Sequence, residues 1–208
     1  MRHRRGSVKL IVAAVLAVIA VVVLWSSAYT VDQSEQAVIT QFRDPVGTAT
    51  EAGLHFKVPF IQAVHRFDKR VLAWDGEVSD MVTAQKKRIT IDTTARWRIT
   101  DPTLFYERVT DETRAQKRLD QRLQSTVEKS VAATELTEIV RSKDWEIDEE
   151  DLKKVVRPEG EGKKLKKEVR TGRAELVRRI REQAARRIGD WGIELLDVRI
   201  KRINYVSD

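Results

Sequence analysis

The side chains that could support acid–base or metal chemistry are few in this sequence and poorly placed for it. His3, His55 and His65 are the only histidines, and none is followed at the fourth position by a second metal ligand. The sequence has no cysteine and none of the G-x-S-x-G, H-E-x-x-H, P-loop or G-x-G-x-x-G motifs. We therefore predict no catalytic residue, no metal site and no cofactor, and we interpret His65 as an ordinary sheet residue.

A run of acids, "EIDEED" at residues 146–151, is the other candidate for acid–base chemistry. It lies in segment 141–167, which is highly charged and has little periodic apolar content, so we interpret this segment as a solvated insertion. A carboxylate pair there lacks the rigid, desolvated setting that catalysis requires. For this segment, the alternative interpretation is an acidic docking site. For the chain as a whole, one alternative is a membrane-anchored periplasmic hydrolase.

The N-terminus predicts a membrane anchor. Sixteen residues from Leu10 to Trp25 contain no polar side chain, and with their flanks, residues 8–29, they reach the ~20 residues that cross a bilayer. A signal peptide cleaved near residues 26–28 is the alternative, although the apolar run exceeds the usual length of its core. The side chains predicted to lie within the membrane include Leu10, Ile11, Val15, Leu16, Ile19, Val23, Leu24 and Trp25.

Charge predicts the topology and argues against nucleic acid as a partner. Arg2, Arg4, Arg5 and Lys9 precede or open the span, so we expect a cytoplasmic N-terminus and a periplasmic main domain on a single pass of a bacterial inner membrane. The first nine residues hold four of the 39 Lys and Arg and no acid, which leaves a net charge of +3 from residue 10 onward. A charge so close to zero does not favour binding to nucleic acid.

The first half of the remaining chain has the alternation of β-strands. A first strand is predicted around residues 38–42, with Phe42 on the face of Val38, then a loop over 43–53 and another strand over 64–71. Residues 88–99 alternate most clearly, which predicts a strand that is wet on one side only. Its apolar face carries Ile89, Ile91, Thr93, Ala95, Trp97 and Ile99.

The second half has the period of helices. Asp101 followed by Pro102 predicts a helix start, and two longer helices are predicted over residues 113–133 and 172–190, with a short one after Thr134. We interpret the arginines of the 172–190 helix as a solvated face, with a surface for a neighbouring subunit as the alternative. The apolar positions are Leu119, Leu123, Val127 and Val131 in the first long helix, Leu176, Ile180, Ala184 and Ile188 in the second, and Leu196, Val198 and Ile200 in a last strand.

The stretch "EAGLHFKVPFI" at residues 51–61 is unusually apolar for so charged a chain. Apolar and polar residues alternate from Leu54 to Val58, which suits a core strand that ends before Pro59. Phe60 and Ile61 lie beyond that break, where a turn is normally polar. The pattern leaves two interpretations open, a core strand and an apolar contact surface.

Four segments in this order and spacing resemble one family. After the N-terminal anchor come "VDQSEQAVITQF", "EAGLHFKVPFIQAVHRFDKRV", "VTAQKKRITIDTTARWRITDP" and "GIELLDVRIKRIN". Together they resemble the SPFH or band-seven family of stomatins, prohibitins, flotillins and HflK/HflC, and the resemblance covers nearly the whole chain. Within the family, "GLHFKVPFI", "DVRIKRIN" and the short N-terminal tail are most similar to the HflC branch.

The resemblance implies an α+β fold. A transmembrane helix precedes an SPFH domain in which a strongly bent antiparallel sheet packs with helices, in two tandem subdomains. We expect a cytoplasmic tail at 1–7, the transmembrane helix at 8–29, a β-rich, membrane-proximal subdomain at 30–100 and an α/β subdomain at 101–208 that holds the insertion at about 141–167. The resemblance also implies that lipid contacts Leu54, Phe56, Val58, Pro59, Phe60 and Ile61.

The function implied by the resemblance is that of a non-enzymatic, HflC-like membrane scaffold. It would form a hetero-oligomer with an HflK-like SPFH protein and regulate an FtsH-like membrane AAA protease; a stomatin-like organiser of membrane domains without an FtsH link is the alternative. Family members continue after the last strand into a long helix rich in Ala, Glu and Arg, whereas this sequence stops at "INYVSD". This end of the sequence is compatible with a fragment, a truncated gene product or a genuine short variant. Whether these 208 residues assemble through such a helix is left open by the sequence.

Overall fold

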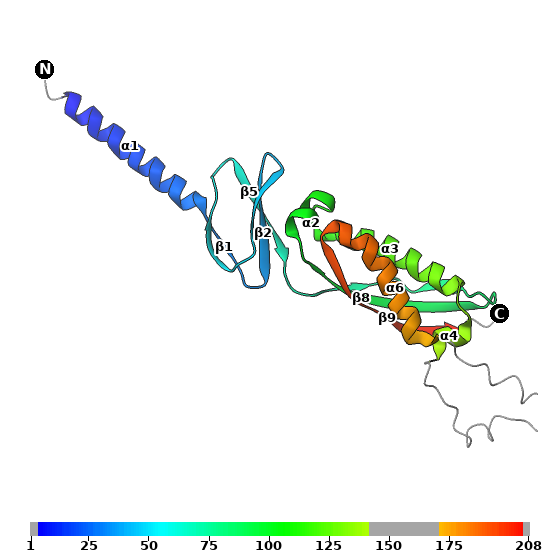
Figure 1. The fold of residues 1–208 in the computed structure, drawn as a ribbon. Coiled ribbons are helices and arrows are strands. Elements are labelled where there is room, and N and C mark those ends of the chain that lie inside the picture. Colours follow the sequence, from blue (N-terminus) through cyan, green and yellow to red (C-terminus); the bar gives the residue numbers. More distant parts are fainter. Residues whose placement is uncertain (1–3, 142–170, 206–208) are drawn as a thin grey trace, which may run out of the picture. The chain divides into compact units, whose positions relative to one another are not determined.

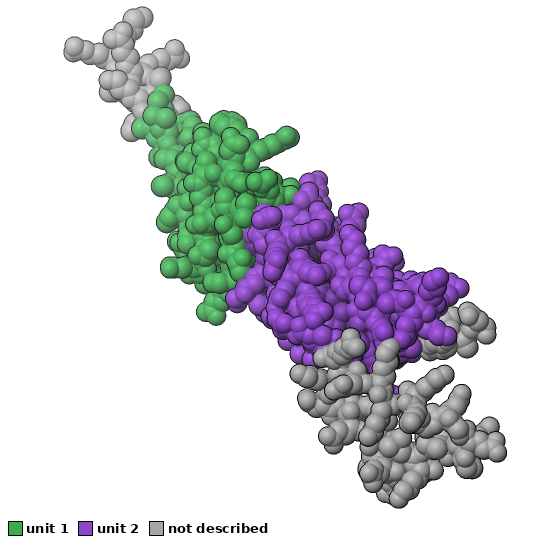
Figure 2. Space-filling model, turned by 45° about the vertical axis from the view of Figure 1, so that its right-hand side comes forward, with its two compact units in different colours: residues 1–70, 99–112 green, residues 71–98, 113–208 purple. Residues whose placement is uncertain are grey.

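The computed structural model describes residues 4–141 and 171–205, with side chains from Val12 to Asn204 (Figure 1). The predicted insertion at 141–167 lies almost entirely outside the described residues, including its acids at 146–151. The chain forms two compact units, and neither is one continuous stretch: unit 1 holds residues 1–70 and 99–112, and unit 2 holds residues 71–98 and 113–208 (Figure 2).

Unit 1 begins with helix α1 (Arg4–Ser27) and contains two small antiparallel sheets. A two-stranded ribbon pairs β1 with β4, and a three-stranded sheet has the order β3-β2-β5. Each strand is short, so these small sheets depend on packing against other elements, and helix α2 contacts β2 and β3. The strands are β1 (Ala28–Val31), β2 (Glu35–Gln41), β3 (Asp44–Ala49), β4 (Gly53–Phe56) and β5 (Gln62–Asp68).

The core of unit 1 joins the ribbon to the sheet. Tyr29 and Val31 of β1 pack with Ala37 of β2 and Ala49 of β3. Helix α2 (Pro102–Arg108) starts as predicted from its Asp-Pro pair, because the Asp101 carboxylate caps it by accepting a hydrogen bond from the Leu104 N–H at 3.0 Å. The rings of Phe67 and Phe105 meet edge to face with centroids 5.1 Å apart.

Unit 2 is built on the long strand β8 (Arg88–Ile99). Strands β6 (Leu72–Asp75) and β7 (Ser79–Val82) pair antiparallel with its C-terminal and N-terminal halves, and β9 (Ile193–Tyr205) also pairs with β8. The face of β8 predicted to be apolar is buried, so that prediction is confirmed. Ion pairs Arg98–Glu194 at 2.7 Å and Arg96–Asp197 at 3.1 Å bridge β8 and β9 on the other face.

Helices α3 (Glu112–Ala132) and α6 (Gly172–Ile188) cover one face of this sheet (Figure 1). Both predicted apolar stripes are buried, from Leu119 to Val131 in α3 and from Leu176 to Ile188 in α6. Helix α4 (Leu136–Val140) follows α3, and a 3₁₀ turn, η1 (Gly189–Trp191), ends α6. Gly192 then takes a left-handed conformation with φ of 72°, which lets the chain turn into β9.

Several predicted strands were wrong in detail. Residues 43–53, predicted as a loop, contain β3, which tolerates Pro45 because β3 is an edge strand of its sheet. Phe42 lies in the turn before β3 and not in the first strand. In β9 Leu195 and Val198 are both buried although they are three positions apart, so the alternation is interrupted between them, as at a β-bulge. Leu196 therefore does not share the buried face. The strands also form three hydrogen-bonded sheets within the described residues, where the resemblance implied one bent sheet.

Candidate membrane-contact surface

The loop from Lys57 to Ile61 is held in shape by two reciprocal hydrogen bonds at its ends. The Val58 N–H donates to the Gln62 side-chain oxygen at 2.8 Å, and the Gln62 N–H donates to the Val58 carbonyl at 3.0 Å. These bonds fix the shape of the loop, and its apolar side chains lie on the outside. Phe60 is 88% exposed at its tip, and Val58 and Ile61 are exposed on either side.

The same loop is bonded to the C-terminal end of α1. Ala28, the first residue of β1, pairs with Phe56, the last residue of β4. Beyond that pair, the Lys57 N–H donates to the Ser27 carbonyl at 2.8 Å, and the Ser27 hydroxyl donates to the Lys57 carbonyl. The loop is therefore bonded to the C-terminal end of α1, in which Trp25 is exposed.

A second aromatic reaches this edge from the turn between β2 and β3. Gln41 pairs with Asp44 across a two-residue turn and also with Gln62 at the start of β5. These pairings bring the turn residues Phe42 and Arg43 beside the Ile61 end of the loop. Phe42 is 80% exposed. The exposed side chains at this end of unit 1, here called the apolar edge, are Phe42, Leu54, Phe56, Val58, Phe60 and Ile61.

The backbone at the apolar edge holds bulky side chains in a conformation that such residues disfavour. Phe42 has φ of 53°, Arg43 has φ of 79° and Phe60 has φ of 66°. Asn or Gly takes such conformations readily, whereas a bulky side chain is disfavoured there. Two phenylalanines occupy these positions although neither packs into the core, so folding does not account for their presence.

The structure places the predicted contact residues on the outside. In β4 and the loop, Leu54, Phe56 and Val58 are exposed, whereas Pro59 is half-buried. The intervening residue His55 is half-buried, and its ring stacks on that of Tyr29 with centroids 5.6 Å apart. This orientation is opposite to that of a core strand, in which the apolar side chains would be buried.

Sequence reasoning missed Phe42 as a member of the apolar edge. The sequence "QFRD" between two strands has no glycine, asparagine or proline, so nothing in it signals a two-residue turn. The only cue in the sequence is Pro45, three residues after Phe42. Because proline cannot donate a hydrogen bond to a neighbouring strand, a central strand that contains Phe42 cannot continue past this point.

Helix α1 continues from this edge toward the N-terminus. Of the side chains predicted to lie in the membrane, the six from Val15 to Trp25 are exposed, whereas those of Leu10 and Ile11 fall outside the described residues. The basic side chains of Arg2, Arg4, Arg5 and Lys9 also fall outside them. Within residues 4–141 and 171–205, no helix combines the length and the apolar content needed to cross a membrane.

The histidines within the described residues have structural partners. The His55 ring contacts the Glu51 carbonyl at 2.9 Å, and the His65 ring contacts the Thr40 hydroxyl at 3.2 Å and lies 4.6 Å from the Tyr106 ring. His65 is thus part of β5, as interpreted from the sequence. Among the described residues, no three His, Cys, Asp or Glu side chains are grouped so that they could hold a metal ion.

Comparison with known proteins identifies the family. The SPFH domain / Band 7 family matches residues 29–208. The chain belongs to this family. The family assignment drawn from the four sequence segments is therefore confirmed, and the mixed fold of antiparallel sheets and helices agrees with it.

Several relatives of this SPFH chain carry the name HflC. Protein HflC of Treponema pallidum is 30% identical over 195 residues, which cover 90% of this chain and 59% of that protein. Protein HflC of Borreliella burgdorferi is 30% identical over 202 residues, covering 96% of this chain and 62% of that protein. The protein named Modulator of FtsH protease HflC in Escherichia coli K12 is 34% identical over 95 residues, 43% of this chain and 28% of that protein. The SPFH chain thus spans about three-fifths of the length of the first two relatives.

Proposed function

We propose that this SPFH chain is a membrane-anchored scaffold that acts, as an HflC-like protein, on an FtsH-like AAA protease. The observation that carries the proposal is the family match over residues 29–208 together with relatives named HflC, one of which is named as a modulator of FtsH protease. In this proposal an HflK-like SPFH protein is the partner in a hetero-oligomer, and the chain has no catalytic activity of its own.

The membrane half of the proposal is supported by the apolar edge. Three phenylalanines, Phe42, Phe56 and Phe60, are 68–88% exposed at the end of unit 1 that is bonded to α1. Burial of such side chains in lipid removes apolar surface from water. Arg43 and Lys57 lie among them, and cations at this level of a membrane can reach lipid phosphates while their stems contact apolar surface.

The proposed topology follows from the N-terminal sequence. Residues 8–29 would cross the inner membrane once, with the basic residues Arg2, Arg4 and Arg5 in the cytoplasm and the domain in the periplasm. The apolar edge would then rest on the periplasmic leaflet. Within the domain, we assign the β-rich, membrane-proximal role to unit 1 and the α/β role to unit 2.

A reconstituted protease assay tests the functional half. The full chain and an HflK-like partner are added to proteoliposomes that contain the FtsH-like protease of the same bacterium, and the degradation rate of a membrane substrate is measured. We expect a change of at least about twofold relative to liposomes with the partner alone. An unchanged rate would favour the stomatin-like alternative, whereas hydrolysis of casein by the chain without the protease would favour the enzyme alternative.

A further inference from the structure

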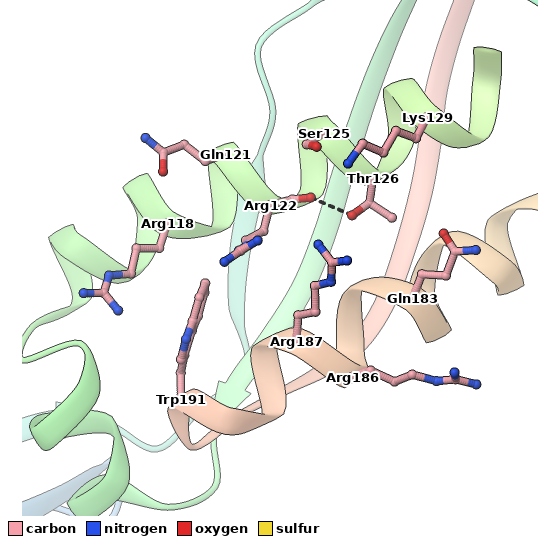
Figure 3. Close-up of a pocket in the computed structure, with 10 residues that line it drawn as sticks. All are labelled: Arg118, Gln121, Arg122, Ser125, Thr126, Lys129, Gln183, Arg186, Arg187 and Trp191. Carbon is pink, nitrogen blue, oxygen red and sulfur yellow. Dashed lines mark hydrogen bonds between the residues drawn. The ribbon is translucent and has the colours of Figure 1, made fainter. Parts of the chain in front are cut away.

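A groove with a strongly basic lining lies between α3 and α6 in unit 2 (Figure 3). Its volume is about 650 Å³. Ten described residues line it, five of them basic and none acidic. They are Arg118, Gln121, Arg122, Ser125, Thr126, Lys129, Gln183, Arg186, Arg187 and Trp191.

The cations of the groove differ from Arg178 and Arg179, which lie nearer the N-terminus of α6. Arg178 pairs with Glu175 at 2.7 Å and with Glu182 at 2.6 Å, and Arg179 pairs with Glu175 at 3.1 Å, so these arginines are neutralised within their own helix. For the five groove cations, no ion pair with a carboxylate is formed within the described part of the chain. Like charges gathered without counter-charges repel one another, and a bound anion would remove that repulsion.

Helix stabilisation explains only part of this cluster. Arg186 and Arg187 lie in the last turn of α6, where cations interact favourably with the helix dipole. Arg118 and Arg122 lie in the middle of α3, where the dipole offers no such stabilisation. Arg118 is instead held over the Trp191 ring, 5.6 Å from its centroid, which fixes a cation at one end of the groove.

The length of the groove indicates the shape of its ligand. Along α3 the lining runs from Arg118 to Lys129, which is about 16 Å at 1.5 Å per residue. Trp191 lies at the Arg118 end, and beyond Gln183 and Lys129 the groove continues as a smaller hollow with Leu176 and Ala133. An extended peptide of about five residues has this length.

Apart from Trp191, the side chains that line the groove come from parts of α3 and α6 away from the N-termini of these helices. The cations of α3 lie beyond its first turn, and the residues of α6 come from its C-terminal half, so no helix N-terminus faces the groove. A single phosphate, which backbone N–H groups typically bind, would reach only a few of the five cations. In Figure 3, Ser125 lies on α3 between Arg122 and Lys129, and Gln183 projects from α6 near the Lys129 end, so their polar atoms can bond to the main chain of a peptide.

We propose that this groove binds an acidic segment of a partner protein in an extended conformation. The carboxylates of that segment pair with Arg122, Arg187 and the other cations, and the amide and hydroxyl groups of the walls bond to its backbone. The inference concerns unit 2 alone and does not rest on the proposed membrane contact or protease role.

Binding of a fluorescein-labelled hexaglutamate peptide to the full chain in detergent micelles tests this proposal by fluorescence anisotropy. We expect binding that weakens as salt is raised and that weakens at least about tenfold in an Arg122→Gln, Arg187→Gln variant. A matched variant, Lys87→Gln, Arg88→Gln, loses the same charge from exposed positions outside the groove and should change the affinity less than about twofold. Circular dichroism checks that each variant is folded.

A second variant tests the site without removing a cation. Ser125→Glu places a carboxylate inside the groove, where it should pair with the nearby arginines and abolish peptide binding. The proposal is overturned if hexaglutamate does not bind, or if the groove variant and its matched control lose affinity equally. It is also overturned if single-stranded DNA or phosphatidylglycerol vesicles bind more tightly than the peptide and lose that binding in the groove variant.

Discussion

Replacing Phe42 and Phe60 by asparagine should separate lipid contact from folding. Both residues have positive φ, of 53° and 66°, and both side chains are exposed, at 80% and 88%. Asparagine tolerates the left-handed region better than an aromatic residue does, so the double variant should fold at least as stably as the original chain. Its membrane affinity should fall, because the two most exposed side chains of the apolar edge are lost.

The size of the expected loss follows from the exposed surface. Complete burial of a phenylalanine side chain contributes about 1.5 to 3 kcal/mol, and the two side chains are exposed enough for most of that to be available. Together they should contribute about 3 to 5 kcal/mol to membrane affinity. This corresponds to a drop of at least about a hundredfold in partitioning.

Liposome flotation and thermal unfolding measure the two effects on one protein. The chain should begin at Ser26, which removes most of α1 but keeps β1, since Tyr29 and Val31 of that strand belong to the core. A matched variant, Val78→Asn, Val82→Asn, exchanges exposed apolar residues of unit 2 and should float like the unsubstituted protein.

We expect reduced flotation with an unchanged or higher Tm for the phenylalanine variant. If the Tm instead falls by more than a few degrees while the folded fraction still floats, the two phenylalanines stabilise the fold and do not contact lipid. Equal losses of flotation in the phenylalanine variant and in its valine control would show only general adhesion of apolar surface.

Three further predictions concern stability. Hydrogen bonds from Arg178 and Arg179 lower the pKa of Glu175 from 4.5 to about 2. The stabilisation of the folded chain by these bonds is therefore complete above pH 4.5 and is lost as the pH falls toward 2. The Tm difference between the original chain and Glu175→Gln should close over that range. Asp101→Ala removes the cap of α2 and should cost about 1 kcal/mol of unfolding free energy in urea titrations. Leu123→Ala opens a cavity at a fully buried position of α3 and should cost about 2 to 5 kcal/mol by the same measurement.

The helices and the long strand of unit 2 could be predicted because their signals are local. The stripe from Leu119 to Val131 repeats at helical spacing over a whole helix, and the alternation of residues 88–99 continues over twelve positions. Burial on one side follows directly from such periods, and the structure buries those sides. In contrast, β6 and β7 have four residues each and depend on pairing with β8, so no local pattern predicted them.

The candidate surfaces were only partly predictable for the same physical reason. The loop residues Phe60 and Ile61 were recognisable because apolar side chains in a turn have no local explanation. Phe42 joins them through the pairing of Gln41 with Gln62, a contact between residues distant in sequence. Likewise, the sequence predicts a basic helix at residues 172–190, but only the packing of α6 beside α3 divides its arginines into paired ones and ones that face the groove.

Purification of the tagged chain from crosslinked membranes of its own bacterium tests the central proposal most directly. Mass spectrometry of the bound proteins should find an FtsH-like AAA protease and an HflK-like SPFH protein enriched over a control in which an unrelated single-pass membrane protein carries the tag. Absence of the protease from a sample in which other membrane proteins are enriched would contradict the proposed role in protease modulation.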